Sequence, residues 1–212
     1  TSVHLTRQNE AHAHMTILSP DQNYLFVTDL GTDKIYRHNI LADGTVDENF
    51  TFTPIPAGQG PRHLTMNAAG THAYLINELK GLVNVFSVKN NELTQIQTLV
   101  ADTTRVPDKG SADIHISSDG LFLYASNRGE ENNIAKFPIL SNGKLAENKR
   151  TLTPSGGKKP RNFTISEDGN WVLVANQDSD NIVVFKRDKI TGDLTNTGNT
   201  IKVSMPVCLL LF

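Results

Sequence analysis

The sequence predicts an all-β protein, a β-propeller of four-stranded antiparallel blades, with about four blades present. A common pattern repeats along the chain, and its equivalent positions, Ser19, Asn67, Ser117 and Ser166, are separated by 48, 50 and 49 residues. Repeats of this length are typical of propellers and solenoids. The apolar residues form short runs rich in β-branched and aromatic side chains, without the i, i+3, i+4 spacing of an amphipathic helix. Because each repeat contains four such runs, each repeat predicts one blade.

Each repeat begins with a short apolar strand, a polar turn and a second strand. The turns read SPDQ, NAAG, SSDG and SEDG, and their Asp, Asn and Gly residues suit a tight hairpin. The second strands are aromatic and β-branched and end in FVTD, YLIN, YASN and LVAN. The last residues of these strands are Asp29, Asn77, Asn127 and Asn176, which we interpret as turn-capping residues of the scaffold.

A third strand and a weaker fourth strand complete each repeat. The third strands read KIYRHNI, LVNVFSV, NIAKFPI and NIVVFKR. His38 occupies the position at which the other repeats carry Phe86, Phe137 and Phe185, so we interpret it as a packing variant. The fourth strands are expected near Thr51 to Ile55, Leu93 to Leu99, Arg150 to Thr153 and Asn199 to Val203.

The repeats predict a single propeller domain over residues 1–212. The repeats lie near 13–58, 62–101, 111–154 and 160–203. The apolar segment 206–212 (PVCLLLF) is interpreted as one more innermost strand, whose blade is missing. Four repeats could close as a small propeller. We favour a ring truncated at its N-terminus, because the chain starts at Thr1 and ends in an unpaired strand. Such an open blade array is expected to self-associate or to pair with the absent half.

Composition excludes several partner classes from the prediction. The 20 basic and 22 acidic residues give a net charge of -2, so no basic field is present that would attract nucleic acid or an anionic membrane. No apolar run approaches the length of a membrane span. The single cysteine, Cys208, lies in an apolar run and predicts a buried, reduced thiol. We therefore expect a soluble, cytoplasmic protein.

Two columns of the repeat alignment carry ionisable side chains that a scaffold does not need. The position just before the first strand holds His14, Arg62, Ala112 and Arg161, and the position just after the second strand holds Leu30, Glu78, Arg128 and Gln177. Because the first two strands of a blade are antiparallel, both columns face one mouth of the channel. A concave, net-positive cluster of this kind favours a small anion. The alternative is that these charges are solvated or brace neighbouring blades through Glu78.

Other catalytic and metal-binding patterns are weaker. Among the seven histidines only His12 and His14 form a close pair, no cysteine partner is near in sequence, and arginines would repel a cation, so we predict no metal and no cofactor. His115 is interpreted as a strand residue without chemistry. The sequence has no G-x-S-x-G elbow. The glycine-rich segment at 156–159 precedes a strand, so we interpret it as a connector and not as a phosphate loop.

The sequence resembles the lactonase, seven-bladed β-propeller family, which holds bacterial 6-phosphogluconolactonases and fungal carboxymuconate-lactonising enzymes. The motifs that carry the resemblance are HAHM (12–15), TDLGTDKIY (28–36), GPRHLTMNAAGTHAYLINEL (60–79), SADIHISSDGLFLYASNRG (111–129) and KPRNFTISEDGNWVLVANQDSDNIVVF (159–185). Seven blades at this period need about 340 residues, so the resemblance implies that roughly three blades are absent from this chain. In lactonising members a histidine, two arginines and a glutamate line one mouth, and these fall on His14, Arg62, Glu78 and Arg128.

The resemblance and the repeat columns predict metal-independent hydrolysis of an anionic sugar lactone at one mouth of the channel. Arg62 and Arg128 would bind the anion and the developing oxyanion, and His14 or Glu78 would move the proton. Substrate binding is assigned to Arg161, which shares the repeat column of His14 and Arg62, and to His63 and His12. Two alternatives remain open: a lactonising cycloisomerase that acts on a carboxymuconate-type substrate, and a non-catalytic propeller that serves as a binding scaffold.

Overall fold

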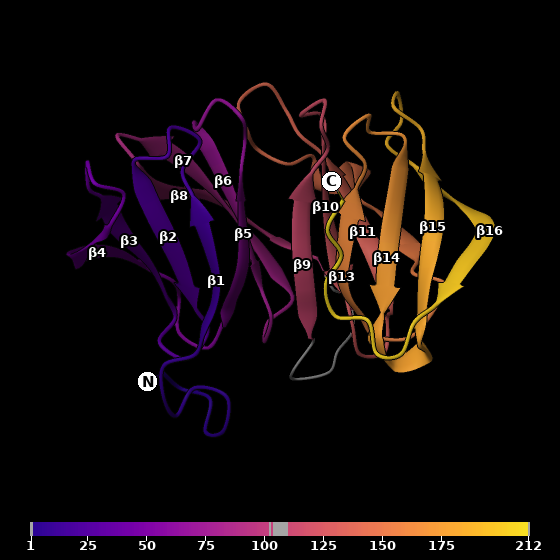
Figure 1. Ribbon diagram of the computed structural model, residues 1–212, viewed down its shortest axis with the longest axis horizontal. Helices are drawn as coiled ribbons and strands as arrows, with labels where there is room; N and C mark the ends of the chain where they lie inside the picture. Colours follow the sequence, from indigo (N-terminus) through magenta and orange to yellow (C-terminus); the bar gives the residue numbers. More distant parts are fainter. Residues whose placement is uncertain (1, 102, 104–109, 212) are drawn as a thin grey trace.

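The computed structural model describes residues 2–101, 103 and 110–211. Its strands form four four-stranded antiparallel sheets, and within each sheet the strands follow one another in chain order (Figure 1). The first sheet holds β1 (Ala13–Leu18), β2 (Tyr24–Asp29), β3 (Lys34–Ile40) and β4 (Val46–Pro54). The second holds β5 (Pro61–Met66), β6 (His72–Asn77), β7 (Leu82–Lys89) and β8 (Glu92–Val100). Both sheets are blades of the predicted kind.

The third and fourth sheets repeat the same order. The third holds β9 (Ser111–Ile116), β10 (Phe122–Asn127), β11 (Asn133–Pro138) and β12 (Thr151–Pro154), and the fourth holds β13 (Pro160–Ile165), β14 (Trp171–Asn176), β15 (Asn181–Arg187) and β16 (Leu194–Lys202). Two short 3-10 helices, η1 (Glu147–Lys149) and η2 (Gln177–Ser179), lie in connections. The all-β prediction is confirmed. The fourth strands β4, β8 and β16 begin earlier than the sequence indicated. No helix in the described part of the chain is long and apolar enough to cross a membrane.

A side chain at the start of each hairpin holds the turn between the first two strands. The hydroxyls of Ser19, Ser117 and Ser166 accept a hydrogen bond from the backbone N–H that opens the second strand, at 3.1, 3.0 and 2.9 Å. The same hydroxyls donate to the Asp two residues later. In the second repeat Asn67 takes over the role by accepting two backbone bonds at 2.9 Å. The repeated S-x-D turns are thus hydrogen-bonded units, as the alignment indicates.

The core consists of three apolar layers, one between each pair of neighbouring blades. The third-strand phenylalanine of each later blade is buried in the layer that it shares with the preceding blade: Phe86, Phe137 and Phe185. His38 stands at the same position of the first blade, which has no preceding blade here. It is half-buried, packs against the ring of Phe50 at 5.5 Å and places Nδ1 2.9 Å from the carbonyl oxygen of Asp47. The interpretation of His38 as a packing variant agrees with this position.

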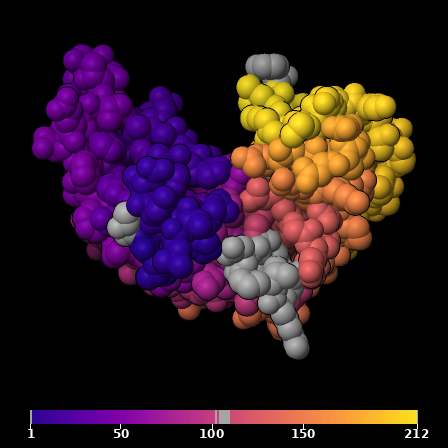
Figure 2. Space-filling model, turned by 90° about the horizontal axis from the view of Figure 1, so that it is seen from below, coloured from indigo at the N-terminus to yellow at the C-terminus, as the bar shows by residue number. Residues whose placement is uncertain are grey.

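The four blades form an open arc. The first strands β1, β5, β9 and β13 contact one another in turn and therefore line the inner side of the arc. Figure 2 shows the arc with a gap between the indigo and purple blade at one end and the yellow blade at the other. Within the described part of the chain, no further blade covers the outer sheet faces of the first and last blades. The arrangement is that of part of a propeller ring.

The C-terminal segment lies where the first strand of a further blade would lie, but it is not a strand. Residues 206–211 have no strand assignment and run alongside β13 (Figure 1), and residue 212 is outside the described residues. Leu209 N–H donates to Asn162 Oδ1 at 2.7 Å, just as Phe163 N–H donates to Asp113 Oδ2 at 3.0 Å. The predicted strand is therefore absent, because no second strand pairs with it here. Cys208 is exposed, so the prediction of a buried thiol was wrong, since no further blade covers it.

Candidate active site

A β-bulge positions each ionisable side chain of the first column. In β1, Ala13 pairs with Asp29 and Met15 with Thr28, which leaves His14 without a partner residue on β2. The registers of β5 and β13 shift at the equivalent place, so Arg62 and Arg161 are also extra residues. The sequence predicted these residues just before the strand; they are its second residue. A bulge bends the strand and redirects the side chain of its extra residue. The same repeat position therefore places His14, Arg62 and Arg161 at bulges of three first strands.

The second column lies directly after the second strands, as predicted. Glu78 follows β6 and Arg128 follows β10, and both side chains are buried. The other two members of the column, Leu30 and Gln177, carry no charge, and Leu30 is part of the apolar core. Of the last residues of the second strands, Asp29 caps its turn as expected, because its Oδ1 accepts from the N–H groups of His12 and Gly31, each at 2.8 Å. Asn77, Asn127 and Asn176 instead donate through Nδ2 to backbone carbonyl oxygens.

Glu78 is the centre of the cluster. Its Oε2 accepts from Arg62 Nε at 2.9 Å and from Arg128 Nη2 at 3.1 Å, and its Oε1 accepts from Arg7 Nη2 at 2.5 Å. Burial disfavours the charged carboxylate, but Arg128, Arg7 and Arg62 outweigh it and lower the pKa of Glu78 to about 2. Glu78 is therefore an ionised carboxylate with three guanidinium partners.

Arg62 is held from several sides. Besides Glu78, its guanidinium donates through Nη1 to the carbonyl oxygen of Ala112 at 2.6 Å and to His63 Nε2 at 3.1 Å. Burial, with Arg128 nearby, lowers the pKa of Arg62 to about 10, so it stays charged at neutral pH. Because His63 Nε2 accepts this bond, its proton is on Nδ1, which lies 2.6 Å from Asp113 Oδ1. Arg62 is thus fixed in one orientation.

His14 is a neutral imidazole with an unused nitrogen. Its ring is half-buried, 5.2 Å from the ring of His63, and its Nδ1 is buried without a hydrogen-bond partner among the described residues. Burial, followed by the charges of Arg62 and His63, lowers the pKa of His14 to about 3. A neutral imidazole next to arginine side chains can accept a proton when an anion that offsets their charge enters the site.

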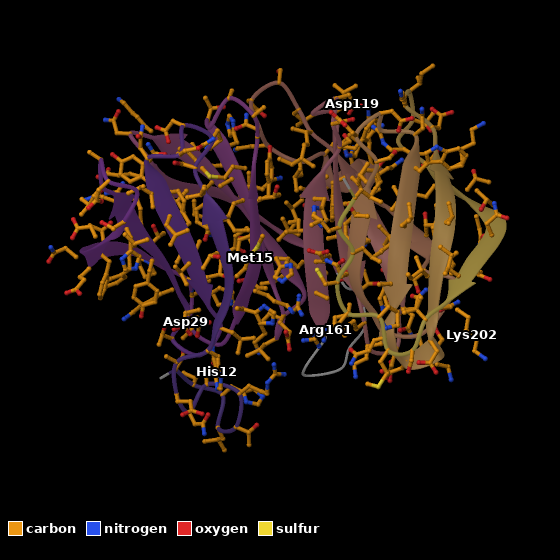
Figure 3. The ribbon with its side chains drawn as sticks, viewed as in Figure 1. His12, Met15, Asp29, Asp119, Arg161 and Lys202 are labelled. Carbon is orange, nitrogen blue, oxygen red and sulfur yellow. The ribbon has the colours of Figure 1, made fainter. Side chains whose placement is uncertain are left out.

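Arg161 carries a positive charge that no described residue neutralises. It is half-buried and makes no hydrogen bond or ion pair with any described residue. It is nevertheless close enough to lower the pKa values of His14, Arg62 and Arg128. Figure 3 shows it at the same end of the blades as His12 and Asp29. The structure thus groups Arg161 with the catalytic candidates.

His12 is the predicted site residue that the structure does not join to this cluster. The residue is exposed, and its backbone N–H and carbonyl group bind Asp29 and Leu30. No contact of its imidazole ring with another described residue is found. Its assignment to substrate binding stays a prediction. Within the described part of the chain, no group of three or more His, Cys, Asp or Glu side chains is placed to hold a metal ion.

Asp113 is a central residue that the sequence analysis missed. Its carboxylate accepts hydrogen bonds from His63, His115 and Asn162 at 2.6, 3.0 and 2.6 Å, and also from two backbone N–H groups. These partners belong to three consecutive blades. Burial would raise the pKa of Asp113, but its histidine partners hold it well below the usual range. His115, interpreted as a residue without chemistry, is the second histidine on this carboxylate.

The repeat alignment contained the signal for Asp113. The column directly after His14, Arg62, Ala112 and Arg161 holds Met15, His63, Asp113 and Asn162, three of which are polar. Arg7 was also missed, and no repeat pattern could have found it, because it precedes the first repeat. Three arginines, at positions 7, 62 and 128, pair with the carboxylate of Glu78, and Arg161 is close enough to lower the pKa values of Arg62 and Arg128. The cluster is strongly net-positive.

Comparison with known proteins shows the family of the chain. Residues 1–211 match the family model described as "Lactonase, 7-bladed beta-propeller". The chain belongs to this family. The 6-phosphogluconolactonase of Formosa agariphila is 39% identical over 97% of this chain and 59% of its own length. The 6-phosphogluconolactonase of Bacillus subtilis is 35% identical over 96% of this chain and 58% of its own length.

Two solved structures resemble the chain closely. A Bacteroides uniformis protein described as a candidate 6-phosphogluconolactonase has a TM-score of 0.91 and 44% identity, covering 98% of this chain and 60% of that one. The periplasmic gluconolactonase of Pseudomonas aeruginosa has a TM-score of 0.86 and 36% identity, covering 95% and 57%. The chain thus spans less than two thirds of each of these relatives, as four blades of seven would.

Proposed function

We propose that this lactonase-family chain carries the active site of a hydrolase that opens an anionic sugar lactone of the 6-phosphogluconolactone type. One observation carries the proposal: a neutral histidine with a free nitrogen, His14, lies beside an excess of guanidinium groups, one of which, Arg161, has no partner among the described residues. A scaffold has no use for unneutralised charge of this kind, whereas an anionic substrate supplies the missing negative charge. The names of the relatives support the same reaction.

The guanidinium groups would bind the substrate and its transition state. Arg62 and Arg128 are buried, oriented by Glu78 and within one cluster, so they can direct N–H donors at a fixed point. Attack of water on the lactone carbonyl places negative charge on the carbonyl oxygen, and preorganised donors in a water-poor site stabilise that charge. Arg161 would bind the phosphate or carboxylate group of the substrate, for which a planar guanidinium fork is well suited.

His14 is a better general base than Glu78. The Glu78 carboxylate already accepts three guanidinium bonds and has a pKa of about 2, so it is a weak base whose lone pairs are largely in use. His14 Nδ1 has no hydrogen-bond partner among the described residues. Burial is the largest cause of the low pKa of His14, and the positive charges that lower it further are charges that a bound anion offsets. Substrate binding would therefore raise the basicity of His14 when the base is needed.

The reaction follows from these roles. His14 removes a proton from water as the water oxygen bonds to the lactone carbonyl carbon, and the carbonyl oxygen becomes an oxyanion beside Arg62 or Arg128. The tetrahedral intermediate then collapses, the bond from the carbonyl carbon to the ring oxygen breaks, and the protonated His14 returns its proton to that oxygen. The product is the open hydroxy acid. Glu78 holds the arginines in place throughout.

The proposal is tested by lactone hydrolysis in the natural full-length chain, corrected for the spontaneous reaction. His14→Ala, Arg62→Ala and Arg128→Ala should each lower kcat/KM for 6-phosphogluconolactone by about 100-fold or more, as expected for the loss of a general base or an oxyanion donor. His38→Gln and Arg150→Ala are matched controls, because these residues bond to backbone carbonyl groups of Asp47 and Val100 outside the cluster.

Two results would overturn the proposal. If Arg62→Ala and Glu78→Gln leave hydrolysis unchanged, the cluster is not the active site and a binding scaffold becomes the better explanation. If the wild-type protein leaves 6-phosphogluconolactone untouched and instead cyclises a carboxymuconate in a parallel assay, hydrolysis is the wrong reaction.

A further inference from the structure

The N-terminal segment 2–12 delivers a third guanidinium to Glu78. This segment precedes the repeats, contains no strand and lies below the first blade, at the end of the blades where Figure 3 shows Arg161 (Figure 1). Arg7 Nη2 lies 2.5 Å from Glu78 Oε1, across 71 residues of sequence. The arginine is therefore part of the cluster although it is not part of any blade.

The residue next to Arg7 anchors the segment. Gln8 is completely buried, and its Nε2 donates to Leu30 O at 2.8 Å and to Asp33 Oδ2 at 2.7 Å. Its Oε1 accepts from the N–H of His4 at 3.1 Å. Because the carboxylate of Asp33 also accepts backbone bonds from Gly58 and Gly60, the anchor is tied to the connection between the first two blades. The backbone at Arg7 is thus fixed by its neighbour.

The side chain of Arg7, by contrast, is the most exposed of the three arginines that pair with Glu78. It is 44% exposed, whereas those of Arg62 and Arg128 are 2% and 9% exposed. Among the described residues its guanidinium bonds only to Glu78, whose other oxygen already pairs with the two buried arginines. An ion pair with an exposed partner contributes little to stability, so a purely structural role explains poorly why a third arginine is placed there.

We propose that Arg7 is a substrate-contacting residue that recognises the anionic group of the lactone. When substrate enters, the Arg7 guanidinium donates a hydrogen bond to a phosphate oxygen of the substrate, either in addition to its bond to Glu78 or in place of it. No covalent bond changes. Its long side chain on a fixed backbone gives it the reach to do so, and its guanidinium can bind two oxygens at once. The segment 2–12 is then one wall of the mouth and favours phosphorylated over uncharged lactones.

This inference rests on the proposed function for its substrate, so its test includes a measurement that does not depend on catalysis. The first measurement is calorimetric titration of the natural full-length chain with inorganic phosphate. Arg7→Ala should weaken phosphate binding about tenfold, Arg7→Lys less, and the control Arg150→Ala less than twofold. Gln8→Ala, which keeps the arginine but loosens its anchor, should weaken binding about threefold. If Arg7→Ala changes the phosphate affinity by less than twofold, the inference is wrong.

The second measurement compares two lactones. Arg7→Ala should lower kcat/KM for 6-phosphogluconolactone about tenfold, mainly through KM, and change kcat/KM for unphosphorylated gluconolactone by less than threefold. An equal loss on both lactones would overturn the inference, because it would mean that Arg7 acts only by orienting Glu78. If the wild-type protein hydrolyses neither lactone, the proposed function fails, and the phosphate titration alone decides the role of Arg7.

Discussion

His63 and Asp113 are joined across the boundary between the second and third blades, with Nδ1 of the imidazole 2.6 Å from Oδ1 of the carboxylate. The other ring nitrogen of His63 accepts from Arg62, so the buried carboxylate fixes the tautomer of a histidine that in turn orients a guanidinium of the candidate site. Asp113 is therefore a positioning residue, because its carboxylate is bound by side chains of three blades and acts on Arg62 through His63.

Asp113→Asn should destabilise the fold as well as the site. The amide cannot accept from two histidines on opposite oxygens, and it leaves His115 without its charged partner. Loss of one partner from a buried ion pair costs about 3 kcal/mol or more of the free energy of unfolding, which urea unfolding would measure. Glu92→Gln makes the same chemical change on an exposed strand residue and should change that free energy by less than about 0.5 kcal/mol. Equal effects of the two variants would contradict the central role of Asp113.

Stability should fall with acid through His14. The pKa of His14 is about 3 in the folded protein against 6.5 in the unfolded chain, so between these values the unfolded chain binds a proton that the folded protein does not. The group therefore lowers stability progressively as pH falls from about 6.5 towards 3, and has no such effect above pH 7. The measurement is Tm against pH for the wild type and His14→Gln. Between pH 6.5 and 4.5 the Tm of the variant should fall less than that of the wild type. Parallel curves would disprove the lowered pKa of His14.

An anion in the site should raise the pKa of His14. Burial is the largest cause of its low value, but Arg62, His63 and Arg161 add to it, and a bound phosphate offsets the arginine charges. NMR titration of the His14 ring protons with and without saturating phosphate would show the shift. In Arg161→Ala the free protein should start from a higher pKa, and phosphate should raise it less. A pKa that phosphate does not move would place the anion away from His14.

The scaffold of the site was predictable from the sequence, and the connections between its residues were less so. Four site residues were recognisable because they are ionisable side chains in repeat positions that a scaffold would keep uniform: His14, Arg62, Glu78 and Arg128. In the structure these four residues lie in one cluster. The bulge that leaves His14 and Arg62 without partner residues leaves no mark in the residue pattern, so their place within the strand was misjudged.

The residues that sequence analysis missed or misjudged depend on contacts outside their own repeat. Arg7 lies outside every repeat, and its role depends on a contact 71 residues away. Asp113 bonds to residues of neighbouring blades. Alignment of the repeats shows that its column is polar, but it does not show which residues of different blades bond to one another. Cys208 was misjudged because its burial needs a neighbouring blade that this chain does not supply.

The outer face of the first blade should make the chain 1–212 self-associate. Phe50 and Phe52 of β4 are 54% and 50% exposed, and both pack against Tyr36 on the sheet face opposite the core that contains Ile35. A sheet face with this much exposed aromatic surface and no neighbouring blade is an association site.

The double variant Phe50→Lys with Phe52→Lys should shift sedimentation of the chain from dimers or larger species towards the monomer. As a control, Val100→Lys changes an exposed apolar residue at the end of β8, in the second blade, and should leave the distribution unchanged. A wild-type chain that sediments as a monomer at tens of micromolar would show that the open face does not associate.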